Sequence, residues 1–116
     1  RVSITNGGGD GFESGARSRS SLQNCTVSTF NGANAAAVRS SGTADVEVTI
    51  SNSSVLFSIN GVKVDLGTAR IADSLVIGNN TGLNNTGGTL KNFTNSNTLD
   101  GNTTPTSGAI TPIAKT

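Results

Sequence analysis

Leu22-Gln23-Asn24-Cys25-Thr26-Val27 is the first clear copy of a phrase that recurs along this chain. The phrase is an apolar residue, any residue, Asn or Asp, a small or aromatic residue, and usually an apolar residue two positions on. Its later copies are Ile50-Ser51-Asn52-Ser53-Ser54-Val55, Ile71-Ala72-Asp73-Ser74-Leu75-Val76 and, more loosely, Leu90-Lys91-Asn92-Phe93, with a degenerate copy at Ile4-Thr5-Asn6. The polar members stand at positions 6, 24, 52, 73 and 92. Their spacing is irregular but near the coil length of a β solenoid.

A second column of turns follows the first in the same order. Each phrase is followed by an Asn-rich turn and then by Gly or Ala before an apolar residue: Asn31-Gly32 ahead of Val38, Asn60-Gly61-Val62 and Asn80-Thr81-Gly82-Leu83. Asn, Ser, Thr and Gly make up 60 of 116 residues, so one isolated match would carry little weight. Two columns that repeat together indicate stacked coils, each of which contacts only its neighbours.

The segments between the turns alternate as strands do. We expect Val46, Val48 and Ile50 to point inward with Glu47 and Thr49 outward. In the next strand we expect Val62, Val64 and Leu66 to point inward, and Lys63 and Asp65 to point outward. Large apolar side chains are few, and Trp, Tyr and Met are absent, which suits a thin solenoid core better than a compact sandwich. No window sustains helical apolar spacing, so almost no helix is expected.

Asn at one corner of every coil has a physical use. It tolerates the left-handed backbone of a tight corner, and its amide can bond to stacked neighbours. We therefore predict a structural ladder of Asn24, Asn52, Asp73 and Asn92. Cys25 is the single cysteine and occupies the slot of Ser53 and Ser74, so we interpret it as a small corner residue.

The order of elements from Ala69 to Asn102 resembles the last coils of bacterial right-handed parallel β-helix repeat proteins, the pectate-lyase-like group. The likeness rests on Gly-Asn-Asn-Thr-Gly-Leu at 78–83, Gly87-Gly88-Thr89-Leu90-Lys91, and Asn97 to Asn102, with a similar tail from Asn102 to Thr111. It implies a triangular coil of three short strands and favours an extracellular or cell-surface location. Relatives of this shape include polysaccharide lyases, phage tailspikes and proteins with no known activity, so the fold says little about function.

The sequence thus predicts an all-β chain, a right-handed parallel β-helix of four to five coils. Residues 1–102 form the coils, with Ile4, Leu22, Ile50, Ile71 and Leu90 stacked in one inner column. Residues 103–116 form a tail that lies across the last coil as a cap, since Pro105 and Pro112 block regular pairing. The chain opens with Arg1, which indicates either a removed leader or a piece of a longer protein. The uncapped strand from Val2 favours the piece.

Candidate chemistry is sparse in this sequence. The densest outward charges are Asp45, Glu47, Lys63, Asp65 and Arg70, which could share one face and hold a hard cation or a sugar. The same residues make an equally natural solvated charge ladder. With no His and no nucleophile beside a base, we expect no enzyme activity, no cofactor and no dedicated metal site.

Three functional classes stay open: an assembly module, a carbohydrate-interacting module and an ice-binding surface, in that order. The abundance of Thr suggests the last, but the Thr residues form no regular Thr-x-Thr array. A homo-oligomer is expected because Val2, Ile4 and Phe12 lack a covering coil. Polysaccharide is a second candidate partner. A basic cluster without aromatic residues argues against nucleic acid, and no run is long enough to span a membrane.

Overall fold

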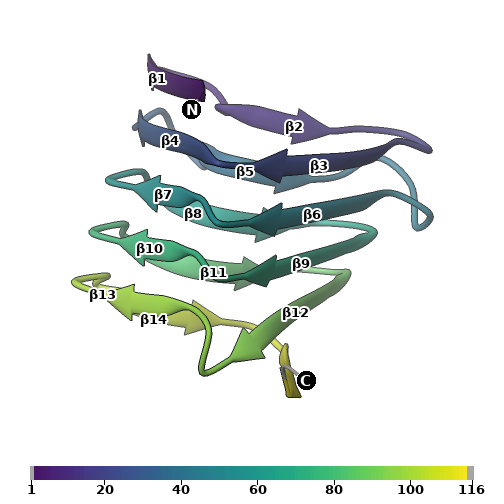
Figure 1. Cartoon of the computed structure of the whole chain (residues 1–116). Helices are drawn as coiled ribbons and strands as arrows, with labels where there is room; N and C mark the ends of the chain where they lie inside the picture. The colour runs from purple at the N-terminus through teal and green to yellow at the C-terminus, as the bar shows by residue number, and fades with distance from the viewer. Residues whose placement is uncertain (1, 115–116) are drawn as a thin grey trace.

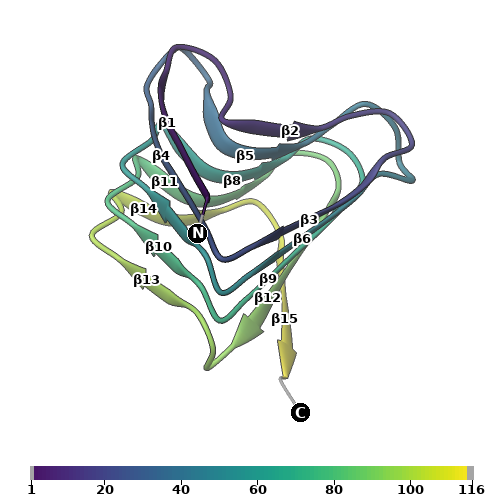
Figure 2. The same cartoon turned by 45° about the horizontal axis from the view of Figure 1, so that its top comes forward.

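The computed structural model describes residues 2–114 as three parallel β-sheets wound into one solenoid (Figure 1). Each turn of the chain contributes one strand to each sheet, so fifteen strands make about five coils. Viewed from the N-terminal end, the chain runs clockwise as it recedes from the viewer (Figure 2), which makes the solenoid right-handed. The predicted fold class is confirmed, including the three strands per turn.

The first strand of each coil belongs to sheet A. Its members, in order through the sheet, are β1 (Val2–Gly7), β4 (Cys25–Phe30), β7 (Ser54–Leu56), β10 (Leu75–Ile77) and β13 (Thr98–Asp100).

The second strand of each coil belongs to sheet B. Its members are β2 (Phe12–Ser14), β5 (Ala36–Ser40), β8 (Asn60–Val64), β11 (Thr81–Asn85) and β14 (Thr104–Ser107).

The third strand of each coil belongs to sheet C. Its members are β3 (Arg19–Gln23), β6 (Glu47–Ser51), β9 (Thr68–Ala72), β12 (Thr89–Thr94) and β15 (Ile110–Ala114).

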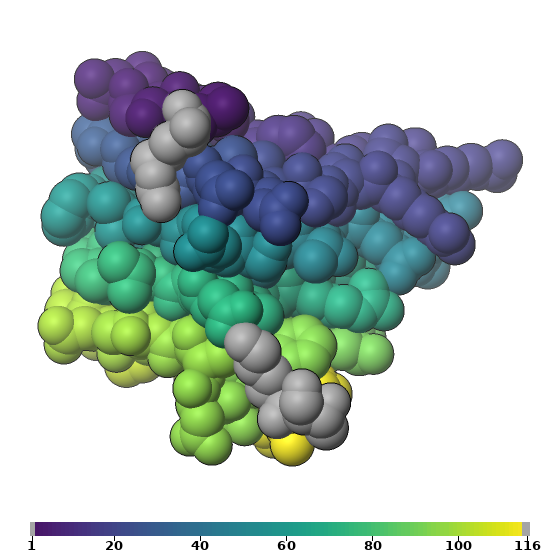
Figure 3. Space-filling view, in the orientation of Figure 1, coloured from purple at the N-terminus to yellow at the C-terminus, as the bar shows by residue number. Residues whose placement is uncertain are grey.

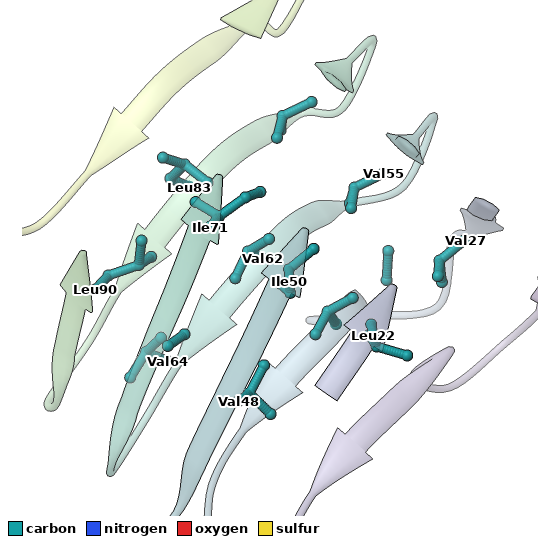
Figure 4. Close-up of a cluster of buried hydrophobic side chains, with 14 of the residues drawn as sticks. Leu22, Val27, Val48, Ile50, Val55, Val62, Val64, Ile71, Leu83 and Leu90 are labelled. Carbon is teal, nitrogen blue, oxygen red and sulfur yellow. The ribbon is translucent and has the colours of Figure 1, made fainter. Parts of the chain in front are cut away.

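A single narrow core runs down the middle of the solenoid and is filled by aliphatic side chains (Figure 4). The largest fully buried side chains are Ile50, Ile71, Leu83 and Leu90, together with a set of valines. Strand alternation explains this filling, because every second residue of a strand points to the same face. The expected inward set is confirmed for Val46, Val48, Ile50, Val62 and Val64. Leu66 departs from it, since it lies in the turn after β8 and is 40% exposed.

The predicted aliphatic column is correct at its centre and wrong at its ends. Leu22, Ile50 and Ile71 do stack in sheet C. Leu90 instead pairs with Ala69, because the residue in register with Ile71 is Asn92, two positions further along β12. Ile4 belongs to sheet A, where it pairs with Val27. Thus the degenerate phrase at the start of the chain is not a further copy of the same corner.

The coils differ in length because two loops of the second coil are longer than their counterparts in the third. The register Ser28↔Leu56 and Ala36↔Asn60 makes the β4–β5 connection four residues longer than the β7–β8 connection. Residues 41–46 likewise exceed the turn at 65–67 by three. The resulting projection from the first two coils is visible at the right of Figure 3. Gly32 lets the longer loop lie against the first coil, because a Cβ there would meet the Gly8 carbonyl oxygen at 1.6 Å.

The tail does not lie across the last coil as expected. Residues 104–107 and 110–114 are regular strands that pair in parallel with β11 and β12. Pro105 and Pro112 are accommodated because β14 and β15 are the outermost strands of their sheets, where one edge needs no donor. The solenoid therefore continues through the described part of the predicted tail, and residues 115–116 lie outside the described residues.

At the opposite end, the apolar residues singled out from the sequence differ in exposure. Val2 is 59% exposed, whereas Ile4 and Phe12 are partly buried and pack against the core. Each lies in the first coil, whose three strands are outermost in their sheets. No helix among residues 2–114 has the length and apolar character needed to cross a membrane.

Candidate interaction surfaces

The corners on either side of sheet A are held by buried polar side chains that bond to the backbone of the neighbouring coil. At the first corner the Cys25 amide donates to Ser53 Oγ at 3.1 Å. The Ser53 amide donates to Ser74 Oγ at 3.2 Å, and the Ser74 amide to Asn97 Oδ1 at 2.9 Å. We call this series the first inner ladder. It satisfies buried amides that the turn of the chain would otherwise leave unpaired.

A second inner ladder follows the other end of sheet A. The amides of Phe30, Ser58 and Asn79 donate in turn to Ser58 Oγ, Asn79 Oδ1 and Asn102 Oδ1, at 3.0, 2.9 and 2.9 Å. Asn79 is 1% exposed and also donates to the Val55 carbonyl at 3.2 Å. A signal for this ladder is present in the sequence, because Asn79 and Asn102 both open turns at equivalent positions of consecutive coils. Sequence reasoning missed it.

The predicted Asn ladder lies one residue before the first inner ladder and is exposed. Asn24, Asn52 and Asp73 all have left-handed backbone, with φ of 56°, 48° and 51°. The Asn52 amide group donates to Asn24 Oδ1. The extension of this ladder to Asp73 stays a prediction.

Asn92 is not the fourth member of that ladder. It lies in β12, paired with Ile71, and its Oδ1 accepts a bond from Asn97 at 2.7 Å. The corner itself is taken by Asn95, with φ 64°. Two extra residues between Asn92 and Thr98 shift the fourth corner, because Leu75 pairs with Ser54 on one side and with Thr98 on the other.

The outer face of sheet B carries a chain of ion pairs and hydrogen bonds across four coils, which we call the Arg39 clasp. Arg39 bonds to Asp10 of the first coil and to Asp65 of the third, at 2.7 Å each. Asp65 also accepts a bond from Thr86 Oγ1 of the fourth coil at 2.6 Å. The Arg39 side chain is only 13% exposed. The clasp joins Arg39 to residues that stand 29 and 26 positions away in the sequence.

The clasp favours the charged forms of Arg39 and Asp65. Burial disfavours the Arg39 charge, but hydrogen bonds and attraction from Asp10 and Asp65 outweigh it and raise the pKa of Arg39. Burial likewise opposes ionisation of Asp65, yet hydrogen bonds from Thr86 and Arg39 and the charge of Lys63 lower its pKa. Both groups are therefore ionised around neutral pH.

The outer face of sheet C carries a separate charge cluster. Glu47 bonds to Arg70 at 2.8 Å and to Arg19 at 3.0 Å. The hydrogen bond from Arg70, followed by the charge of Arg19, lowers the pKa of Glu47. Lys91 pairs in register with Arg70, so Glu47 sits among three basic side chains.

The predicted cation or sugar face is therefore divided. Lys63 and Asp65 lie together on the sheet B side, with Nζ and Oδ1 3.7 Å apart, whereas Glu47 and Arg70 lie on sheet C. Asp45 lies in the projecting loop and accepts a bond from Thr43. The register explains the error, because the residue that stacks on Glu47 is Thr68, whereas Asp65 lies in the turn between β8 and β9. Sequence reasoning also missed Asp10 and Arg39, which come from the coils with long loops.

The outer face of sheet A differs from the other two. Its outward residues are Ser3, Thr5, Thr26, Ser28, Ser54, Leu56, Leu75, Ile77, Thr98 and Asp100. One of these ten is charged, and the three apolar ones are adjacent in the third and fourth coils. We call this surface the A face.

Residues 2–114 contain neither a pocket nor a group of three His, Cys, Asp or Glu side chains placed to hold a metal ion. Comparison of the chain with family models, with curated proteins and with solved structures gave no significant match. The fold and the surfaces described above are thus the basis for any statement about function.

Proposed function

We propose that this chain is a non-catalytic structural module that associates with copies of itself. The observation that carries the proposal is the use of its charged side chains. Arg39 bonds to Asp10 and to Asp65 across three coils, and the Arg39 side chain is largely withdrawn from solvent. Such partly buried, charge-assisted bonds restrict the relative motion of the coils. They serve rigidity, as expected of a spacer or assembly unit.

The resemblance to the pectate-lyase-like group enters this proposal as a shared architecture. We propose a bacterial protein of that group on the sequence motifs alone. Catalysis in such an enzyme would need an acidic cluster with a free Arg or Lys on neighbouring coils. Here Asp65 is bonded to Arg39 and Thr86, and Glu47 to Arg70 and Arg19. A base engaged in such bonds is poorly placed to remove a substrate proton.

The test is a pair of measurements on the wild-type chain. Light scattering over a hundredfold range of concentration should give a mass that rises above that of the monomer. Incubation with polygalacturonate should release no unsaturated product. Release of product that Asp65→Ala or Lys63→Ala abolishes would overturn the non-catalytic part. A monomeric mass throughout the range would overturn the self-association part.

A second candidate function is carbohydrate binding on sheet C. Its outward residues form a polar column that crosses all five coils: Ser21, Thr49, Arg70, Lys91 and Thr111. Hydroxyl and cationic groups in a straight row could bond to successive units of an acidic polysaccharide laid along the solenoid.

A glycan array should separate this candidate from the first. Binding to acidic glycans that Lys91→Ala removes would support it. Arg17→Asn is the matched control, because it also removes one positive charge, lies away from the column, and places a residue that tolerates the left-handed φ of 60°. Equal loss with both variants would indicate unspecific charge attraction.

A further inference from the structure

The A face is distinguished first by its charge. Of its ten outward residues only Asp100 is charged, and that residue lies in the last described coil. The outer faces of the other two sheets carry Glu13, Arg39 and Lys63, or Arg19, Glu47, Arg70 and Lys91. Covering those faces would remove charges from water, which is costly. Covering the A face would remove almost none.

The centre of the A face is apolar and accessible. Leu75 is 42% exposed, and half-buried Ile77 lies two residues further along the same strand. Ile77 pairs with half-buried Leu56 of the coil above. Phe57, at the corner where β7 ends, is 56% exposed. Thr26 and Ser54 of the coils above and Thr98 of the coil below frame this centre with small polar residues. An apolar centre with a polar rim is the composition of a protein interface.

Phe57 provides a second, independent observation. Its φ is 54°, a left-handed conformation in which a bulky side chain is strained. The corresponding corners of the next two coils carry Gly78 and Gly101, which adopt positive φ without strain. The Phe57 ring lies over Gly78, where an added Cβ would meet the ring at 2.5 Å. The chain thus keeps a strained, exposed aromatic residue, and its glycine neighbour makes room for the ring. The same corner of the preceding coil is Thr29, with φ 68°, so the exposed aromatic ring, and not the strained backbone, distinguishes Phe57.

We propose that the A face is the surface through which two copies of this chain associate. This inference rests on the proposed function, and it commits to a second copy as the occupant. A face with almost no charge meets an identical face without like-charge repulsion. In a two-fold dimer Leu75 and Phe57 of each copy pack against the same region of the other. The solenoid axes then lie side by side, and the Arg39 clasp stays in solvent.

The size of the A face determines how strongly two copies are expected to bind. Five strands about 4.8 Å apart, each with a few residues in the sheet, give a footprint of roughly 300 Å² per copy. A stable interface commonly covers about 800 Å² per partner. The contact between two chains is therefore weak, and the dimer fraction depends strongly on concentration.

The experiment measures the dissociation constant by sedimentation equilibrium for wild type, Leu75→Lys and Ala44→Lys. Leu75→Lys places like charges opposite each other across the two-fold axis, so the dissociation constant should rise at least tenfold. Ala44→Lys adds the same charge at an exposed site in the projecting loop at 41–46 and should leave the constant within twofold of wild type. Circular dichroism and thermal melts establish that each variant is folded.

Phe57→Gly provides the decisive variant. It puts at this corner the residue found at Gly78 and Gly101, so the melting temperature should equal or exceed that of wild type. Its dissociation constant should nevertheless rise at least threefold. A purely structural role for the ring would lower the melting temperature and leave association unchanged, which would overturn the inference.

The outcomes separate the inference from the function on which it rests. If wild type dimerises and neither Leu75→Lys nor Phe57→Gly weakens the dimer, the chain self-associates through another surface and only the inference is wrong. If wild type is monomeric at every concentration, the self-association part of the proposed function is wrong as well. If Leu75→Lys fails to fold, Leu75→Thr replaces it, because Thr98 occupies the next position of the same column.

Discussion

The inside and the outside of one corner offer the most instructive comparison in this molecule. Asn24 and Asn52 on the outside are exposed and bond to each other. One residue later, Cys25, Ser53 and Ser74 are buried and bond to the backbone of the neighbouring coil. An exposed group exchanges its bond with water at little cost, whereas a buried group has no substitute. The exposed Asn residues of the repeated phrase therefore allow the left-handed backbone of the corner. The buried side chains that follow them bond to the neighbouring coil and stabilise the corner.

The largest loss of stability is expected from a substitution in the aliphatic core, next to both inner ladders. Ile71→Ala should lower the free energy of unfolding by about 2 to 5 kcal/mol, because it opens a cavity in a core one side chain wide. Ile71 is fully buried between Ile50 and Asn92. Chemical denaturation measures the loss. A loss near zero would mean that the coils can close over the missing atoms.

The second largest loss of stability is expected from a substitution in the buried ladders at the inside of the corner. Asn79→Ala leaves the Ser58 amide and the Val55 carbonyl without their partners in a buried site. We expect a loss of about 2 to 4 kcal/mol. Asn79→Ser is the matched variant, because Ser58 fills the equivalent slot one coil above and accepts a bond from the Phe30 amide. It should retain about half of the stability that alanine loses. Equal losses from Ala and Ser would show that the bond to the Ser58 amide contributes little.

The outside of the corner should matter less. Asn52→Leu loses an exposed hydrogen bond and places a branched side chain at φ 48°. The strain alone costs about 1 to 2 kcal/mol. Thr49→Ser, on the exposed face of the preceding strand, should change stability by less than about 0.5 kcal/mol. If Asn52→Gly restores full stability, the residue serves the backbone conformation; if it does not, the amide bond to Asn24 carries more than we expect.

The smallest change in stability is expected when Cys25 in the first inner ladder is replaced by the residue found at the equivalent positions of the next two coils. Cys25→Ser puts into the second coil the residue that Ser53 and Ser74 supply in the third and fourth. Its hydroxyl can donate to the Gln23 carbonyl, as the Ser53 hydroxyl does to Ser51. The unfolding free energy should change by less than about 0.5 kcal/mol. A large loss would point to a packing role for sulfur that the other coils do not share.

Spacing in the sequence was sufficient wherever the coil length is constant. Ile50 pairs with Ile71 and Val55 with Val76, each in the next coil, and the repeated phrase aligns both pairs correctly. Leu22 with Ile50 was also correct despite the longer loops between them, because the phrase around each residue is the same. Asn92 and Leu90 were misplaced because the phrase there is degenerate. The two residues added after Asn92 disguise the corner, so the pattern alone selects the wrong Asn.

The candidate surfaces were harder to predict than the fold. Glu47 and Asp65 were assigned to one face as outward residues of successive coils, but Glu47 lies in β6 of sheet C and Asp65 follows β8 of sheet B. Arg39 and its two acidic partners are separated by loops of unequal length. No periodicity connects Asp10 with Arg39. Only the stacked coils bring them within hydrogen-bond distance.

The sequence by itself determined the parallel solenoid, its aliphatic interior and its left-handed Asn corners, because these follow from residue type and a repeat of about one coil. The tertiary structure decided which outward residues share a face, that the tail continues two sheets, and that Leu75 and Phe57 lie exposed on an almost uncharged face. The physical reason is that contacts between coils depend on the number of residues in every loop. A change of two or three residues leaves the core pattern recognisable, yet it assigns each surface side chain to a different neighbour.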